Sequence, residues 1–280
     1  MNKSRVINKS ELFYTTKYVD GNLNEYYQHI LNNIRLFLTN NNVPYSVNFG
    51  CEDISKDINL DFQFEHTILK NGEDRCTCKI HRFYSLIKNH SVFEYSNANI
   101  QHIKTFTKSD QYLNICHYYP PLIYEATDSD NRTKNCLTIH NSNERRNLIH
   151  DVIDMDYYHN VCPGDVYSKT HIKNVMDGYK LLVNIHQKET NLTLEELRVL
   201  PALITGILII SEDVPYKEHI PYSKHIIWSS YDKLTTTINN VLNNYDFFRK
   251  QYLSGLDETL NEMRYNSNKV MEIIFKNYTK

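Results

Sequence analysis

Charged side chains suited to phosphate binding gather at one predicted helix start. His186 ends an apolar run, and a polar loop follows it. Glu195, Glu196 and Arg198 then occupy the first turns of a predicted amphipathic helix. A helix N-terminus presents unpaired N–H groups and partial positive charge, and an arginine adds a two-pronged clamp for an anion. The stretch therefore predicts a binding or catalytic site for a phosphorylated ligand, with Arg198 as its main cation.

The elements that position these side chains follow one another in a recognisable order. An apolar strand over 180–186 is followed by the polar loop 187–193, the helix, a glycine turn and a second apolar strand over 207–210. This is the order of a βαβ unit in a parallel sheet. Such sheets bind ligands where strand ends meet helix starts, so the loop beginning at Gln187 should open onto the site.

A second polar group follows an earlier predicted strand, at 135–140. Asn141, Asn143, Arg145 and Arg146 lie at the start of a predicted helix over 144–152. These side chains could hold a diphosphate or a uracil-type base. An exposed turn that caps the helix would have the same composition, and the sequence does not choose between the two.

These residues carry a resemblance to a known family. The chain resembles the C-terminal half of GT-B-type glycosyltransferases, in particular the spore-maturation-protein-like group and related enzymes of giant viruses. The matching residues are Val183-Asn184-Ile185-His186, Leu197-Arg198-Val199, Ala202, Gly206 and Ser211-Glu212-Asp213, with Leu137 to Asn141 and Glu144-Arg145-Arg146 upstream. The resemblance covers about half of the chain well and the first half loosely.

The resemblance implies an α/β, GT-B-like fold with two Rossmann-like halves, mainly parallel sheets and an abbreviated N-terminal half. It implies transfer of a sugar from a nucleotide-sugar co-substrate to a hydroxyl of a glycan, lipid or protein, without metal or other cofactor. The implied donor-binding residues are Arg198, Arg145, Arg146, Asn141, Asn143, Gln187, Glu212 and Asp213. The catalytic candidates are Glu195, Glu196, His186 and His66. Glu212 and Asp213 would also suit a capping role or a charged surface.

Pro201 is a departure from the family pattern. Many of these enzymes have a glutamate at this position, where it contacts the donor sugar or its ribose. Proline removes a helix hydrogen bond, so we expect the helix to bend or to start near Pro201. Glu195 or Glu196 can supply the missing carboxylate. Otherwise the chain is a binding or scaffold protein that has kept the fold and lost catalysis.

Two further groups have weaker signals. Glu65 and His66 lie in a predicted strand of the first half and could deprotonate an acceptor hydroxyl, although the polar face of a strand has the same pattern. Cys76, Cys78 and His81 resemble part of a zinc site that lacks a fourth ligand, which favours an exposed loop.

Two D-x-D triplets leave a third function open. GT-A-type glycosyltransferases hold a divalent metal with such a pair. Asp128 and Asp130 fall in a predicted linker, and Asp154 and Asp156 fall at the end of a predicted helix. Neither pair follows a buried strand, so both are predicted to be solvated acids.

The first half shows an alternation of predicted helices and strands. We expect a helix over 22–39 and strands over 45–50, 59–69, 91–95 and 112–117, with Pro120 and Pro121 in the linker. The predicted domains are an acceptor-side domain over 1–128 and a nucleotide-sugar-binding domain over 129–280. Helices are also expected from 231 to about 253 and over 257–275.

Composition excludes several other classes of protein. The net charge of −2 argues against a nucleic-acid binder. With seven glycines the chain has no dinucleotide-binding or P-loop motif. The first residues have no apolar signal segment, no apolar run is long enough to span a bilayer, and the six cysteines are irregularly spaced. We expect reduced cysteines and a cytoplasmic protein, in the host cytoplasm if the protein is viral.

Overall fold

The computed structural model of the chain describes residues 10–14, 45–49, 59–63, 91–94, 96–98, 100–101, 115–117, 132–140, 142–157, 175–190 and 193–276. The chain divides into two compact units. Unit 1 comprises Met1–Val19, Gln28–Pro121 and Met263–Lys280, and unit 2 comprises Asp20–Tyr27 and Leu122–Glu262. The domain boundary that we place between 128 and 129 remains a prediction.

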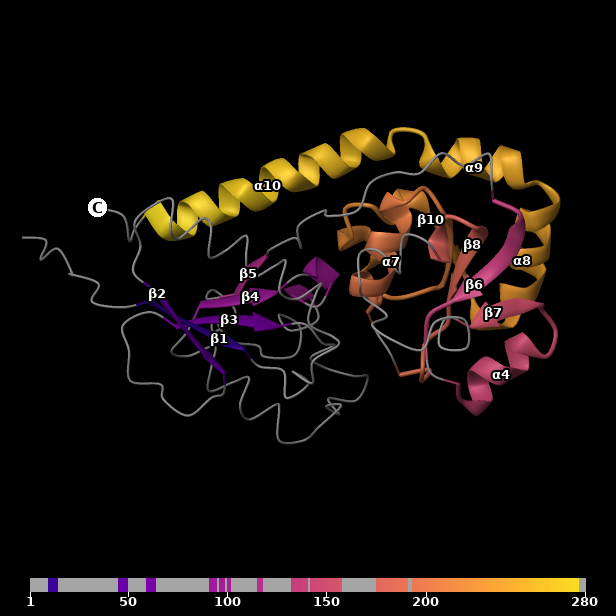
Figure 1. Cartoon of the computed structure of the whole chain (residues 1–280), viewed down its shortest axis with the longest axis horizontal. Helices are drawn as coiled ribbons and strands as arrows, with labels where there is room; N and C mark the ends of the chain where they lie inside the picture. The colour runs from indigo at the N-terminus through magenta and orange to yellow at the C-terminus, as the bar shows by residue number, and fades with distance from the viewer. Residues whose placement is uncertain are drawn as a thin grey trace, which may run out of the picture. The chain divides into compact units, whose positions relative to one another are not determined.

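Unit 1 contains a sheet of five parallel strands. They are β1 (Ser10–Tyr14), β2 (Tyr45–Phe49), β3 (Asn59–Gln63), β4 (Ser91–Glu94) and β5 (Ile115–His117), in the order β2-β1-β3-β4-β5 (Figure 1). The four strands expected from the sequence are all present. Strand β1, which pairs with both β2 and β3, is not predicted from the sequence.

Unit 2 contains a second sheet of five parallel strands. They are β6 (Lys134–Thr138), β7 (Met155–Tyr157), β8 (Tyr179–Asn184), β9 (Leu208–Glu212) and β10 (Ile226–Ser229), in the order β10-β9-β8-β6-β7. Both sheets have the same connectivity, because in each the first strand pairs with the second on one side and with the third on the other. The predicted fold, two Rossmann-like halves with parallel sheets, is confirmed.

The central strands of unit 2, β8 and β9, are buried on both faces, as expected for a parallel sheet covered by helices. All five residues of β9 are buried, and five of the six residues of β8 are buried. Leu181, Val183 and Ile210 pack with Ile238 and Val241, which belong to a helix beside the sheet (Figure 1). This core fixes the strand ends on which the candidate site lies.

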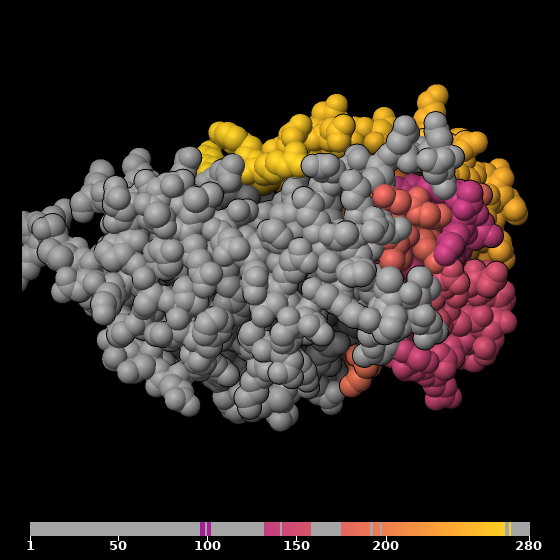
Figure 2. Space-filling model, in the orientation of Figure 1, coloured from indigo at the N-terminus to yellow at the C-terminus, as the bar shows by residue number. Residues whose placement is uncertain are grey.

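Among the described residues of unit 2, the helices are α4 (Glu144–His150), α7 (Glu196–Ile204), α8 (Leu234–Asn243) and α9 (Tyr245–Leu253), with the short 3-10 helices η4 (Lys217–His219), η5 (Ser223–His225) and η6 (Tyr231–Lys233). Helix α10 (Leu256–Lys276) contains the division between the units and confirms the predicted terminal helix. The surface of residues 142–157, which include α4, is visible in Figure 2.

Three sequence expectations need correction. The single helix predicted from 231 to about 253 is wrong, because Asn244 has a non-helical backbone (φ −126°, ψ 37°) that separates α8 from α9. Asp156, predicted at the end of a helix, lies instead in strand β7. Helix α7 starts five residues before Pro201 and continues through it to Ile204.

No helix in the described part of the chain is long and apolar enough to cross a membrane.

Candidate functional site

The carboxyl edge of the unit 2 sheet contains a topological switch point. From β6 the chain forms β7 on one side and β8 on the other, so the segments that leave β6 and β8 diverge at this edge (Figure 1). In open parallel sheets, ligands bind at such divergent strand ends. The segment after β6 leads into α4, and the segment after β8 leads into α7. The two predicted polar groups therefore belong to one edge.

Arg198 is held at this edge by the last residue of β8. Its NH1 donates a hydrogen bond of 2.9 Å to Oδ1 of Asn184. The Asn184 amide donates in turn to Glu195 Oε2 at 2.9 Å and to Ser211 Oγ at 3.1 Å. The buried Nε of Arg198 has no hydrogen-bond partner among the described residues, and no carboxylate there forms an ion pair with this arginine. Its positive charge is therefore anchored by a neutral amide.

His186 and Glu195 form a buried pair at the same edge. The His186 ring is 2% exposed, and its Nδ1 lies 3.0 Å from Glu195 Oε2. Its other nitrogen, Nε2, is buried and has no hydrogen-bond partner within the described ranges. Burial alone disfavours the imidazolium, but the Glu195 carboxylate and its hydrogen bond outweigh burial and raise the pKa of His186 above its ordinary value.

The first turn of α4 is fastened to the segment after β8. Three side chains donate hydrogen bonds of 3.0 Å to three consecutive backbone carbonyls: Asn143 to Gln187, Arg145 to His186 and Arg146 to Ile185. The Asn143 side chain also caps α4, since its Oδ1 accepts a hydrogen bond of 2.9 Å from the Arg146 backbone N–H. The capping role that the sequence allowed therefore applies to Asn143, and its contact with a diphosphate or a base stays a prediction.

Arg145 is neutralised by a partner from β9. Its guanidinium forms a two-pronged ion pair with the Glu212 carboxylate, including an NH1–Oε2 bond of 2.7 Å, and lies 3.8 Å from the Tyr231 ring centroid. Glu212 Oε2 also accepts a hydrogen bond of 3.0 Å from the His186 backbone N–H. Arg145 and Glu212 therefore fix the His186 backbone, Arg145 through its carbonyl and Glu212 through its N–H.

His140 also lies at this edge, and it is not among the candidates predicted from the sequence. Thr138 Oγ1 donates to the Val183 carbonyl at 3.1 Å, so His140 Nε2, at 2.7 Å, must donate to Thr138 Oγ1. Burial, assisted by Arg146, Arg198 and His150, lowers the pKa of His140 to about 2, which makes the ring neutral. The signal that could have identified the pair is a threonine and a histidine at the end of an apolar strand.

The structure separates the two adjacent glutamates. Glu195 contacts the edge residues described above, whereas Glu196 is 3% exposed and accepts a hydrogen bond of 2.8 Å from the Tyr222 hydroxyl. The structure thus does not bring Glu196 to the candidate site. Asp213 is exposed and pairs with Lys217 at 2.6 Å. Gln187 is also exposed and contributes its backbone carbonyl to the contact with α4.

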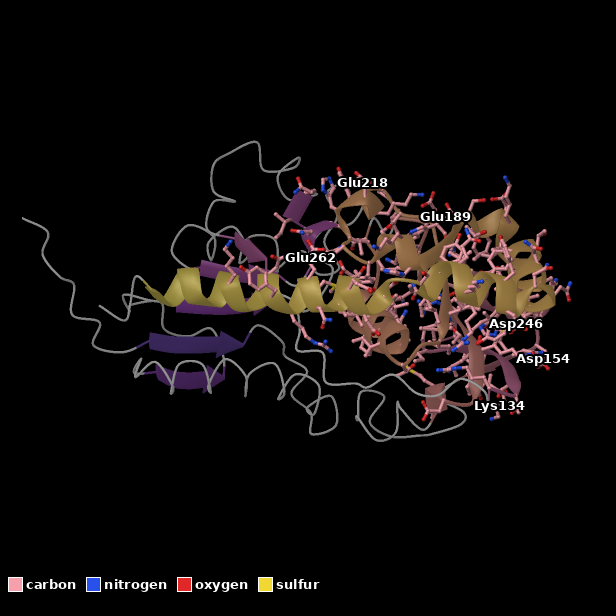
Figure 3. The ribbon with its side chains drawn as sticks, turned by 90° about the horizontal axis from the view of Figure 1, so that it is seen from above. Lys134, Asp154, Glu189, Glu218, Asp246 and Glu262 are labelled. Carbon is pink, nitrogen blue, oxygen red and sulfur yellow. The ribbon has the colours of Figure 1, made fainter. Side chains whose placement is uncertain are left out.

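Several predicted residues lie outside the described ranges: Asn141, Glu65, His66, Cys76, Cys78, His81, Asp128 and Asp130. The second D-x-D lies at the opposite, amino edge of the sheet. Asp156 accepts a hydrogen bond of 2.5 Å from the Tyr179 hydroxyl, and Lys134 Nζ is 3.7 Å from the same carboxylate. Figure 3 shows Lys134 and Asp154 well apart from Glu189 in the loop after β8. Among the residues that the structure describes, no three potential ligands are grouped to hold a metal ion.

Comparisons with known proteins show a likeness of fold. The sequence matches no family profile and no curated protein. The structure of TarM aligns with 81% of this chain at 13% identity and a TM-score of 0.57, and this chain spans about half of TarM, 52%.

A second solved structure is that of the DNA-modifying enzyme β-glucosyltransferase, determined with and without its substrate uridine diphosphoglucose. It aligns with 96% of this chain and 99% of its own, at 12% identity and a TM-score of 0.50. Both neighbours are GT-B glycosyltransferases. Together with two parallel sheets of the same strand order, these likenesses show that the chain has the GT-B fold.

Proposed function

We propose that the chain is a glycosyltransferase that binds a nucleotide-sugar at the carboxyl edge of the unit 2 sheet. The observation that carries the proposal is the pair of buried nitrogens without hydrogen-bond partners among the described residues, Arg198 Nε and His186 Nε2. Both belong to residues held at the end of β8, next to the switch point. A buried polar group without a partner is costly, and these two nitrogens lie at an edge where parallel sheets bind ligands, so a bound donor can complete them.

The chemistry is the displacement of a nucleoside diphosphate. An acceptor hydroxyl oxygen bonds to the anomeric carbon, the bond from that carbon to the diphosphate oxygen breaks, and the hydroxyl proton passes to a base. Arg198 and His186 balance the charge that develops on the departing diphosphate, without a metal ion. The base proposed from the sequence is His66, assisted by Glu65. The acceptor is a glycan, a lipid or a protein.

Arg145 and Arg146 have a positioning role in this proposal. The Arg145 charge is neutralised by Glu212, and the Nε of Arg146 donates to a backbone carbonyl. Both hold the segment that carries His186, so they support donor binding through that segment. The spore-maturation-like and giant-virus relationship stays a resemblance, and the cytoplasmic location stays an expectation from the sequence.

A binding protein without catalysis is the second candidate. Pro201 favours it, because proline stands where many related enzymes have a glutamate, and the carboxylate of Glu195 is already engaged by His186 and Asn184. The GT-B fold argues against the third candidate, a metal-dependent transferase of GT-A type. Nucleotide binding is common to the first two candidates, and turnover separates them.

A thermal-shift screen tests donor binding. A ligand that binds only the folded chain at 100 times its Kd stabilises it by about 2.7 kcal/mol. We expect a rise in Tm with uridine or guanosine diphosphates and their sugars, and a smaller rise in the Arg198→Ala variant. If no nucleotide or nucleotide-sugar raises the Tm, the proposal is wrong. A rise without hydrolysis or transfer of any donor would favour the binding protein.

A further inference from the structure

The hydrogen bonds of His186 define which of its nitrogens carries a proton. Nδ1 lies 3.0 Å from Glu195 Oε2, and a carboxylate only accepts hydrogen bonds, so Nδ1 carries a hydrogen. Nε2 is therefore bare in the neutral ring and carries a hydrogen only in the imidazolium. An oxygen of a phosphate is also an acceptor, so Nε2 can bind it only when the ring is charged.

The surroundings of His186 favour that charged form. The groups that act on the ring are Glu195 at the start of α7, Glu212 at the end of β9 and Arg145 on α4. Two are carboxylates, and one is an arginine that is itself paired with Glu212. Burial opposes the charge, but the carboxylates dominate, so the pKa of His186 is raised. Glu195 is held in place by the Asn184 amide at 2.9 Å, and it cannot turn away without losing that bond.

We propose that His186 and Glu195 form a proton-coupled clamp for the donor diphosphate, in which Nε2 donates to a phosphate oxygen while Glu195 holds Nδ1, so that donor binding takes up a proton. The inference rests on the proposed function and adds its dependence on pH. A bound diphosphate supplies a second negative partner, which raises the pKa of His186 further. Between the pKa of the free and the bound forms, affinity falls by about tenfold for each pH unit as the pH rises, because one proton is bound with the ligand.

Calorimetric titration with UDP-glucose and GDP-mannose measures this uptake directly. In these donors each phosphate has one ester and one anhydride bond and no second ionisable oxygen, so neither titrates between pH 6 and 9, unlike a terminal phosphate whose second pKa is about 6. Titrations in buffers of different ionisation enthalpy give the number of protons taken up at each pH. For the wild type we expect an uptake of up to one proton and an affinity that declines with rising pH.

Two variants identify the group that takes up the proton. Glu195→Gln keeps an acceptor for Nδ1 but removes the negative charge that raises the pKa of His186. The donor affinity of this variant should therefore begin to decline at a lower pH than the affinity of the wild type. His186→Asn should bind weakly and take up no proton. Glu218→Gln, which removes an exposed carboxylate on η4, is the matched control and should behave as the wild type.

The outcomes separate this inference from the proposed function. Binding of either donor without proton uptake between pH 6 and 9 would overturn the clamp and leave the donor site intact. Uptake that persists in His186→Asn would also overturn it, since another group would then be responsible. If no nucleotide-sugar binds at any pH, the proposed function is contradicted and the clamp fails with it.

Discussion

The three arginines near the carboxyl edge differ in their partners. Arg145 is paired with Glu212 and stacked on Tyr231, and the Nε of Arg146 donates to the Ile185 carbonyl. Arg198 is held only by a neutral amide in the part of the chain that the structure describes. Since a carboxylate already neutralises Arg145, Arg198 should contribute more of the attraction for a diphosphate.

Replacement of Arg198 tests this difference. Arg198→Ala should weaken binding of UDP or GDP by about 1.5–3 kcal/mol, the scale of a hydrogen bond to a charged group. Arg198→Lys should restore only part of the loss, because lysine lacks the planar fork. Calorimetric titration measures both variants, and Lys224→Ala, at an exposed lysine before β10, is the control. Unchanged affinity in Arg198→Ala would remove this residue from the site.

The two adjacent glutamates should have different phenotypes. Glu195→Gln should reduce turnover more than it reduces nucleotide binding, because it changes the charge next to His186. Glu196→Ala should instead lower the stability by about 1–3 kcal/mol, because it removes an acceptor from the buried Tyr222 hydroxyl. Steady-state kinetics and urea denaturation distinguish them. A large loss of turnover in a stable, folded Glu196→Ala variant would contradict the assignment.

The sequence could identify the edge but not the role of each residue on it. The end of an apolar strand predicts His186 as a site residue, and the start of a helix predicts Arg198. The choice between Glu195 and Glu196 depends on where the helix begins, and helix ends are uncertain by one or two residues in sequence patterns. The pairing of Arg145 with Glu212 joins residues 67 positions apart, which no local pattern contains.

Helix α4 and the segment after β8 hold each other in place. Three hydrogen bonds from the first turn of α4 fix consecutive carbonyls of that segment. Because α4 has only seven residues, its own stability is small, and these contacts must also hold α4 in place. The orientation of His186 therefore depends on α4.

Substitutions at Asn143 separate its capping of α4 from its hydrogen bond to the Gln187 carbonyl. Asn143→Ala removes both interactions and should lower the free energy of unfolding by about 1 kcal/mol, the usual cost of a lost cap. Asn143→Asp retains a capping acceptor but has no N–H to donate to the Gln187 carbonyl. Asn143→Asp should therefore fold with near-wild-type stability and show faster hydrogen exchange over 186–190. Equal exchange rates in Asn143→Asp and the wild type would show that this bond does not hold the segment.

The elements with strong apolar patterns were the ones predicted best. The buried runs of β8 and β9 and the long helix α10 were identified from composition and period alone. Strand β1 was missed because its five residues, SELFY, have no long apolar run, and its stability comes from pairing with β2 and β3. The break at Asn244 was missed because the apolar period continues across it, while α8 and α9 both pack against the sheet.

At the scale of the whole molecule, the two sheets repeat one strand order. Alternation of strands and helices predicted parallel sheets, but strand order depends on pairings between distant segments. Residues Cys136 and Leu181 are neighbours on adjacent strands, for example, and 45 positions apart in the chain. The order is what places the ends of β6 and β8 at a switch point, so the candidate site follows from topology as much as from its residues.

Buried histidines should make the stability of unit 2 depend on pH. Burial lowers the pKa of His140 to about 2 and that of His150 to about 4. For each histidine the pKa in the folded state lies below the value near 6.5 in the unfolded state. The contribution of the neutral ring to the free energy of unfolding is therefore complete above pH 6.5 and is lost as the pH falls below that value. One such group contributes a slope of at most about 1.4 kcal/mol per pH unit.

The variant His140→Gln tests this dependence, because its amide can donate to Thr138 in place of Nε2 and does not titrate. Urea denaturation at pH 7, 6 and 5 should show a smaller loss of stability on acidification in the variant than in the wild type. Parallel curves for the two proteins would mean that His140 does not take up a proton on unfolding.

Release of nucleoside diphosphate from a donor tests the central claim most directly. The wild type and Arg198→Ala are incubated with UDP-glucose or GDP-mannose in EDTA, and free UDP or GDP is followed over time. We predict release by the wild type from at least one donor, and a rate at least about tenfold lower in Arg198→Ala, as expected from the loss of one charged hydrogen bond. Equal rates in the two proteins, or no release from any nucleotide-sugar by the wild type, would contradict the account.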